Sequence, residues 1–247
     1  MPIDSIAAEH AYESWPLGRI PLEHQRPELE AIKRLGYDWK DPWDVVALFE
    51  RKVAEFAGSK YAVAVDCCSH GLALALKYLN PDGHSQVVSI PKRTYVSVPM
   101  QIIHAGCTPY FRNENWSGAY QLLPYPIYDA AVRWTEGMFT EQGGIQVVSF
   151  QLKKRIPIGR GGMVLTDKPH IAQWIRRAAY DGRTLTSPYP EDAISEIGWH
   201  YYMTPEDAAR GLILMDNTAR RNVDSACASN YTDLSALPCF ARYGKDQ

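Results

Sequence analysis

Residues 147–167 read VVSFQLKKRIPIGRGGMVLTD, and this stretch does the most to decide the fold. Two apolar runs, over 145–150 and 163–166, have the length and composition of buried strands. The loop between them holds Lys153, Lys154 and a glycine cluster that lets backbone segments approach closely. A lysine fixed between two strands could be presented to a phosphorylated aldehyde cofactor as a Schiff base. A solvated cationic turn is the alternative interpretation of the same basic residues.

Strand-like and helix-like patterns alternate along the rest of the chain. The spacing of Val45, Phe49, Val53 and Phe56 predicts an amphipathic helix that ends at Gly58. The other expected helices cover 27–35, 70–79, 96–105, 170–180 and 205–220, and the expected strands cover 61–66, 87–90, 109–111, 126–129, 145–150 and 163–166. This order predicts an α/β fold, in which ligands bind beyond the carboxyl ends of parallel strands.

The chain is long enough for one large core, since 46% of its 247 residues are hydrophobic. We expect an N-terminal arm over residues 1–42, which are rich in Pro, Trp and charge. A main domain should cover 43–225. The stretch 226–247 shows no clear periodicity, so we expect an irregular C-terminal tail there.

Charge and composition narrow the classes of partner. Lys and Arg number 26 and Asp and Glu 28, with no basic stripe, so we do not expect a nucleic-acid partner. No apolar run approaches the roughly 18 to 20 residues that span a bilayer, and the N-terminus lacks the order of a secretory signal. We therefore expect a soluble, cytoplasmic protein with no membrane partner. The five cysteines form no CxxC pair, which indicates neither a disulfide framework nor a metal site.

Three predicted strands end on residues suited to a phosphorylated ring cofactor. Ser69 opens a helix, where its hydroxyl and backbone amides could bind phosphate, although a plain N-cap explains it equally well. Tyr95 could stack on a planar ring, with core packing as the alternative. Asp129, followed by Ala130 and Ala131, could keep the ring nitrogen of pyridoxal phosphate protonated, with a turn or helix cap as the alternative.

The order and spacing of these motifs resemble the DegT/DnrJ/EryC1/StrS family of pyridoxal-phosphate-dependent aminotransferases, which act mostly on nucleotide-linked keto sugars. The resemblance runs from residue 20 to about 217 and includes FERKVAEFAGSKYAVAV at 49–65, the lysine loop and MTPEDAARG at 203–211. It implies the aspartate aminotransferase fold, fold type I: a large domain with a mixed, mainly parallel sheet flanked by helices. It also implies a homodimer whose sites include residues of the partner chain.

Carried over residue by residue, the resemblance implies a complete cofactor site. Lys154 matches the lysine of the pattern S-F-x-x-x-K and would form the internal aldimine with pyridoxal 5'-phosphate, while Asp129 would pair with the pyridine nitrogen. These two are the implied catalytic residues. The implied cofactor-binding residues are Ser69, His70, Tyr95, Asp129, Ser149 and Lys154, together with His200 and Tyr202, which would reach the partner's cofactor phosphate.

The implied reaction is a ping-pong transfer of an amino group from an amino donor to a keto-sugar substrate, with Lys154 moving the proton. The alternative is a non-catalytic or degenerate module that binds the cofactor or a sugar and serves dimerisation. The short chain, which lacks most of the family's C-terminal small domain, favours that alternative, as do His200 and Tyr202, where the family has Asn and Arg. Retention of Lys154 and Asp129 favours catalysis.

Overall fold

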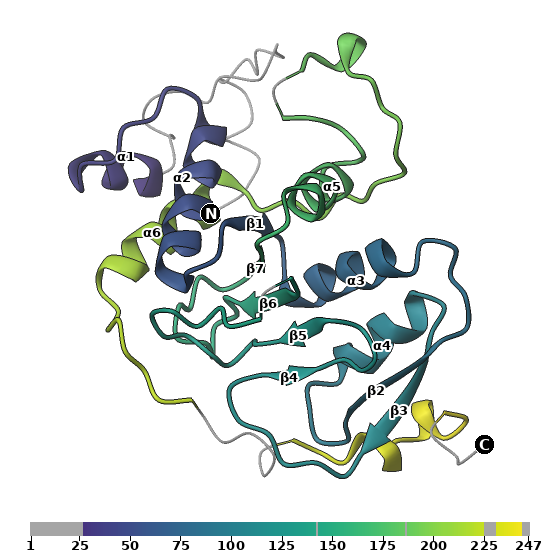
Figure 1. The fold of residues 1–247 in the computed structure, drawn as a ribbon. Coiled ribbons are helices and arrows are strands. Elements are labelled where there is room, and N and C mark those ends of the chain that lie inside the picture. The colour runs from purple at the N-terminus through teal and green to yellow at the C-terminus, as the bar shows by residue number, and fades with distance from the viewer. Residues whose placement is uncertain (1–26, 142, 186, 225–230, 244–247) are drawn as a thin grey trace, which may run out of the picture.

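The computed structural model describes residues 27–141, 143–185, 187–224 and 231–243, which form a central sheet with helices on both faces (Figure 1). The strands are β1 (Tyr61–Val65), β2 (Val87–Pro91), β3 (Thr108–Arg112), β4 (Tyr120–Gln121), β5 (Ile127–Asp129), β6 (Ile145–Ser149) and β7 (Gly162–Thr166). The α-helices are α1 (Pro27–Arg34), α2 (Pro42–Ala57), α3 (Cys68–Leu79), α4 (Ser97–His104), α5 (Pro169–Ala179) and α6 (Pro205–Asp216). Most of the predicted N-terminal arm, residues 1–26, lies outside the described part of the chain.

The main sheet has the strand order β1-β7-β6-β5-β4, and β2 pairs with β3 in a separate two-stranded sheet. Ser89 and Leu123 bridge the two sheets through hydrogen bonds of 2.8 and 3.1 Å. The predicted α/β fold with a mixed sheet is confirmed, but the expected majority of parallel pairs is wrong. Among the described strands, β2–β3 and β5–β6 are parallel, whereas β1–β7, β6–β7 and β4–β5 are antiparallel. The chain reverses direction between β4 and β5 and between β6 and β7, which makes these consecutive strands antiparallel neighbours.

Both faces of the sheet are covered, and β1 contributes to each in turn. Ala62 and Ala64 face the apolar layer formed with α1, α2 and α6. Val63 and Val65 face the second layer, formed with α3, α4 and α5. This alternation follows from the period of two along a strand. Because both sides are apolar, the strands have the continuous hydrophobic sequence from which they were predicted.

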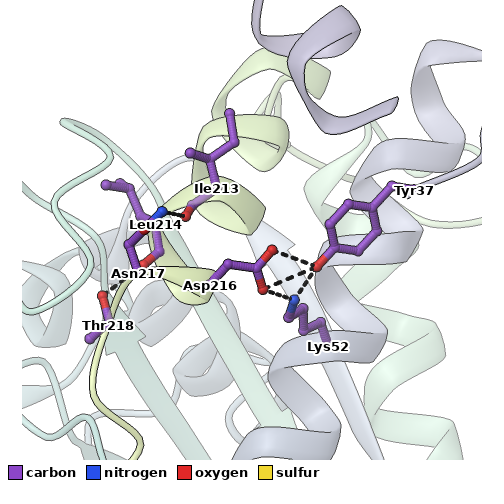
Figure 2. Close-up of polar contacts among 7 residues, drawn as sticks. All are labelled: Tyr37, Lys52, Ile213, Leu214, Asp216, Asn217 and Thr218. Atoms are coloured by element: carbon purple, nitrogen blue, oxygen red, sulfur yellow. Dashed lines mark hydrogen bonds and ion pairs between the residues drawn. The ribbon is translucent and has the colours of Figure 1, made fainter. Parts of the chain in front are cut away.

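Helix α2 is fixed at its ends and along its length. Asp41 caps its N-terminus in a capping box, and Gly58 ends it in the left-handed region at a φ of 80°. Lys52 donates hydrogen bonds to the Tyr37 hydroxyl and to the Asp216 carboxylate at the end of α6 (Figure 2). Burial lowers the pKa of Lys52, but these bonds outweigh it and raise that pKa above its usual value.

Helix α6 ends at Asp216, four residues before the predicted end. Asn217 and Thr218 donate to carbonyls of its last turn (Figure 2), and residues farther along pair with a different part of the chain. Arg220 forms an ion pair with Glu136, and Arg133 donates to Asp224 at 2.7 Å. No helix in the described ranges is long and apolar enough to cross a membrane.

The described part of the C-terminal tail, residues 231–243, lies beside β3 (Figure 1). It contains two short 3₁₀ turns, η5 (Leu234–Ala236) and η6 (Pro238–Phe240). Leu234 and Phe240 are buried, and the Phe240 ring lies 5.7 Å from that of Phe111 on β3. The described tail therefore packs on the body of the protein through apolar contacts.

Candidate active site

The carboxyl ends of β1, β5 and β6 lie at one edge of the main sheet. Gly162 on β7 pairs with Val65 on one side and with Ser149 on the other, so the ends of β1 and β6 are level. Asp129 at the end of β5 pairs with Val147 on β6. A Cβ atom at residue 162 would lie 2.6 Å from the backbone nitrogen of residue 68, so a glycine is needed where β7 passes the start of α3.

Asp129 is a buried carboxylate whose hydrogen-bond partners are neutral. Its side chain is 3% exposed, and it accepts hydrogen bonds from the Tyr120 hydroxyl at 2.7 Å and from the Ala131 backbone N–H at 2.9 Å. Burial raises the pKa of Asp129, although these bonds and the charge of Lys154 act in the opposite direction. The carboxylate is therefore held in a place where a further positive charge would stabilise it.

Lys154 lies in the loop between β6 and β7 and is half-buried, whereas Lys153 beside it is exposed. Its backbone N–H donates to the Gln151 carbonyl at 2.8 Å, which shapes the turn. The charge of Lys154 acts on Asp129 and also on the buried thiol of Cys68, where it opposes the effect of burial on the pKa. Of the two loop lysines, Lys154 is thus the one whose charge acts on groups at the strand ends.

The turn between β1 and α3 differs in one detail from the prediction. The N-cap of α3 is Cys67, whose Sγ accepts from the His70 backbone N–H at 3.4 Å, so the N-cap alternative for Ser69 is wrong. Ser69 lies in the first turn of the helix, where its Oγ is 2.6 Å from the Oγ of Ser97 at the start of α4. Two hydroxyls and two helix N-termini meet there, an arrangement that favours anions. Ser149 is half-buried at the end of β6, and its Oγ accepts a 3.4 Å hydrogen bond from Gln151.

His70 forms a charged cluster beside this turn. Its Nδ1 lies 2.6 Å from the Asp66 carboxylate, and its ring stacks on Tyr201 at 3.7 Å. Burial lowers the pKa of His70, but the interactions with Asp66 and Cys67 together outweigh burial and raise that pKa to about 9. Arg160 also donates to Asp66, at 2.5 Å. The side chains of Asp66, Cys67 and His70 could reach one metal ion, but the two cations already neutralise Asp66 and disfavour a third.

Tyr95 lies in the turn between β2 and α4, and 57% of it is exposed. Core packing therefore does not explain this aromatic residue. The preceding residue, Thr94, is buried, and its Oγ1 is 2.6 Å from the Tyr120 hydroxyl that donates to Asp129. The turn is thus linked to the buried carboxylate through two hydrogen bonds.

His200 and Tyr202 lie away from Asp129, on the side of the chain near α2 and α5. The His200 Nδ1 is 2.8 Å from the Asp181 carboxylate, and its side chain is largely exposed. The Tyr202 ring packs edge-on against Trp43 at 5.3 Å and against Tyr180 at 5.2 Å. Within this one chain, neither residue contacts the turn that carries Ser69. Their predicted place at the partner's cofactor stays a prediction.

Sequence reasoning missed several residues of this edge. Tyr120 lies on β4, a two-residue strand too short to produce a periodic pattern. Ser97 and Tyr201 are distant in sequence from the groups they contact, Ser69 and His70. Thr94 could have been predicted from the sequence, because it is a polar residue that directly precedes Tyr95 and therefore lies in the same turn.

Comparisons with known proteins agree with the geometry. The model of the DegT/DnrJ/EryC1/StrS aminotransferase family matches residues 25–116 and 130–235. The chain belongs to this family. Its members use pyridoxal phosphate. The matched residues include every described candidate of the site except Asp129, which lies one residue before the second match begins.

One curated relative is the spore coat polysaccharide biosynthesis protein SpsC of Bacillus subtilis, which is 26% identical over 205 residues. The match covers 66% of this chain and 52% of SpsC, so the chain spans about half the length of that relative. AtS13 from Actinomadura melliaura has a similar fold, with a TM-score of 0.71, 16% identity and coverage of 90% of this chain and 86% of AtS13. The sugar aminotransferase CalS13 from Micromonospora echinospora gives a TM-score of 0.66 and 14% identity at the same coverage.

Proposed function

We propose that this protein is a pyridoxal-phosphate-dependent aminotransferase that acts on a nucleotide-linked keto sugar. The observation that carries the proposal is Asp129, a buried carboxylate with neutral hydrogen-bond partners and with Lys154 close enough to act on its charge. Family membership adds the class of cofactor, and the names of SpsC and CalS13 point to sugar substrates.

The residues at the strand ends fit pyridoxal phosphate. A protonated pyridine nitrogen would supply the positive charge that the Asp129 site favours, and the carboxylate would hold the proton there. When bound, the cofactor supplies an electron sink for the substrate carbon. The hydroxyls of Ser69, Ser97 and Ser149, with the first turn of α3, would hold its phosphate.

Lys154 would hold the aldehyde carbon and then move a proton to and from the substrate carbon as a general base and acid. Its half-buried position between two fixed strands limits the directions in which the amine can reach. The exposed ring of Tyr95 would stack on the cofactor ring.

The assignment can be tested by adding pyridoxal phosphate to the purified protein and treating the complex with borohydride. We expect a visible absorption band that disappears on reduction, with the covalent label on Lys154. The Lys154→Ala variant should lose the band and the label, whereas Lys153→Ala, which changes the exposed neighbour, should keep both. A label on Lys153, or no band at saturating cofactor, would refute the assignment.

The alternative, a non-catalytic binding module, predicts the same band with no turnover. His200 and Tyr202, which replace the family's Asn and Arg, are the observation in its favour. Mixing the cofactor-loaded protein with L-glutamate and other amino donors distinguishes the two functions. Loss of the band in a single turnover supports an aminotransferase, and a band that persists with every donor supports the module.

We further propose a homodimer in which His200 and Tyr202 approach the partner's cofactor phosphate. His200 is largely exposed and available for such a contact. Both side chains can donate hydrogen bonds, more weakly than an arginine would. Replacing both by alanine should weaken cofactor binding and leave the monomer folded. A monomer in sedimentation that still binds the cofactor tightly would contradict this assembly.

A further inference from the structure

A cavity of about 310 Å³ lies between the turn that carries Tyr95 and the C-terminal segment. Its volume is at the lower end of small-molecule sites, roughly 300–1,000 Å³, and suits a single ring with its substituents. None of its lining residues is charged; they are Thr94, Tyr95, Val96, Tyr231, Thr232, Leu234 and Leu237. Aromatic faces, apolar side chains and hydroxyls are suited to a ring with few charges.

The C-terminal wall of this cavity is fastened to the opposite wall. Lys92 Nζ lies 2.8 Å from the Asp233 carboxylate, and the Leu234 backbone N–H donates to the Lys92 carbonyl at 2.8 Å. Arg93 Nη1 donates to the Tyr231 carbonyl at 3.0 Å. The main chain of the C-terminal segment therefore has a fixed position relative to the turn.

The cavity is also linked to the buried carboxylate of the candidate active site. Thr94 lines it and is linked through the Tyr120 hydroxyl to Asp129. A second connection is made by aromatic rings, since Trp116 packs against Tyr120 at 4.7 Å and against Tyr231 at 6.3 Å. Both connections place the cavity next to the proposed position of the cofactor ring.

We propose that residues 231–237 form one wall of a substrate subsite that takes the keto-sugar ring. This inference rests on the proposed function. The part of a substrate that lies next to the cofactor must be the reacting ring, and the uncharged lining matches a sugar better than a diphosphate. The C-terminal segment thereby closes the substrate side of the site and contributes to its specificity through Tyr231 and Leu237.

The test compares Leu237→Trp, which fills the cavity, with Leu35→Trp, which changes an exposed leucine at the end of α1. Calorimetry on protein loaded with pyridoxal phosphate measures binding of a thymidine-diphosphate-linked 4-keto-6-deoxyhexose, which cannot accept an amino group in that state. We expect Leu237→Trp to raise the Kd of the keto sugar by about tenfold or more. Its affinities for pyridoxal phosphate and for free thymidine diphosphate should stay within about twofold of the Leu35→Trp values.

A second variant, Asp233→Asn, loosens the wall without changing its shape, and Arg242→Gln in the same segment is its control. We expect faster hydrogen exchange at the Leu234 amide and a severalfold weaker affinity for the keto sugar. The inference would be overturned if Leu237→Trp bound the keto sugar as tightly as the wild type does. It would also be overturned if Asp233→Asn kept its keto-sugar affinity while the Leu234 amide exchanged faster, or if the cofactor-loaded wild type bound no keto sugar. Failure of wild type to bind pyridoxal phosphate would instead refute the proposed function.

Discussion

Asp66 directly follows β1 and Asp129 ends β5, and these two strands run in the same direction. The surroundings of the two carboxylates nevertheless differ. Asp66 accepts from two cationic side chains, His70 and Arg160. Asp129 accepts from a tyrosine hydroxyl and a backbone N–H, and burial raises its pKa. The charge of Asp66 is therefore compensated within the chain, whereas that of Asp129 is left for a bound cation to compensate. Asp66 therefore has the surroundings of a carboxylate that stabilises the fold, whereas Asp129 has those of a carboxylate that binds a cationic group.

Asp129→Asn should have the largest effect, because it removes the carboxylate that we assign to the cofactor ring nitrogen. We expect the rate of amino transfer from donor to cofactor to fall about 100-fold or more, measured in single turnovers. Cofactor affinity should fall much less. An unchanged single-turnover rate would show that Asp129, like Asp66, has a structural role and does not act on the cofactor.

The same variant tests the charge of Asp129 without any cofactor. Since the pKa of Asp129 is raised in the folded state, ionisation costs the wild type stability as pH rises above about 4. An asparagine at residue 129 does not ionise, so the stability of this variant relative to wild type should increase from pH 4 to pH 7. Urea denaturation at several pH values measures this difference, and a constant difference would contradict the assigned burial effect.

Tyr120→Phe should have an intermediate effect. It removes the hydroxyl that donates to Asp129 and leaves the strand and ring in place, so the pKa of Asp129 should rise further. We expect a loss of about tenfold in single-turnover rate, with the rate profile shifted to higher pH. Tyr128→Phe on the neighbouring strand is the control, and equal profiles for the two variants would exclude a role for Tyr120.

Asp66→Asn should lower the pKa of His70 below its value of about 9, because the largest of the interactions that together outweigh burial is removed. The folded-state pKa of His70 is raised, so its stabilisation is complete below pH 6.5 and is lost as pH rises through 9. At pH 7 we expect a loss of about 1–3 kcal/mol, with smaller losses at higher pH. Denaturation and an NMR titration of His70 measure the two effects, and a His70 pKa that stays near 9 would contradict the pairing.

Arg160→Gln should have the smallest effect. Arg160 is 66% exposed, so its ion pair with Asp66 contributes less than about 1 kcal/mol. His70 should keep its raised pKa, since its bond to Asp66 remains. A large drop in the His70 pKa in this variant would show that the cluster is one coupled unit.

The positions of the helices and strands were mostly predictable from local patterns. The apolar spacing in α2 and the left-handed residue Gly58 at its end are local features, and the structure has the helix where they predict it. Strand β4 and the early end of α6 were not predictable in this way. Tyr120–Gln121 is too short to show a period, and the path after Asp216 depends on distant partners such as Glu136 and Arg133.

The sequence by itself determined the α/β order, the family resemblance and the types of residue at the strand ends, because these depend on spacing along the chain. Only the tertiary structure decided which of those residues share surroundings. It placed Tyr120 between Thr94 and Asp129 and gave Asp66 its two cations. It also made Lys154 the loop lysine whose charge acts on Asp129. Charge and pKa depend on burial and on partners many residues away, and these are set when the sheet and helices pack.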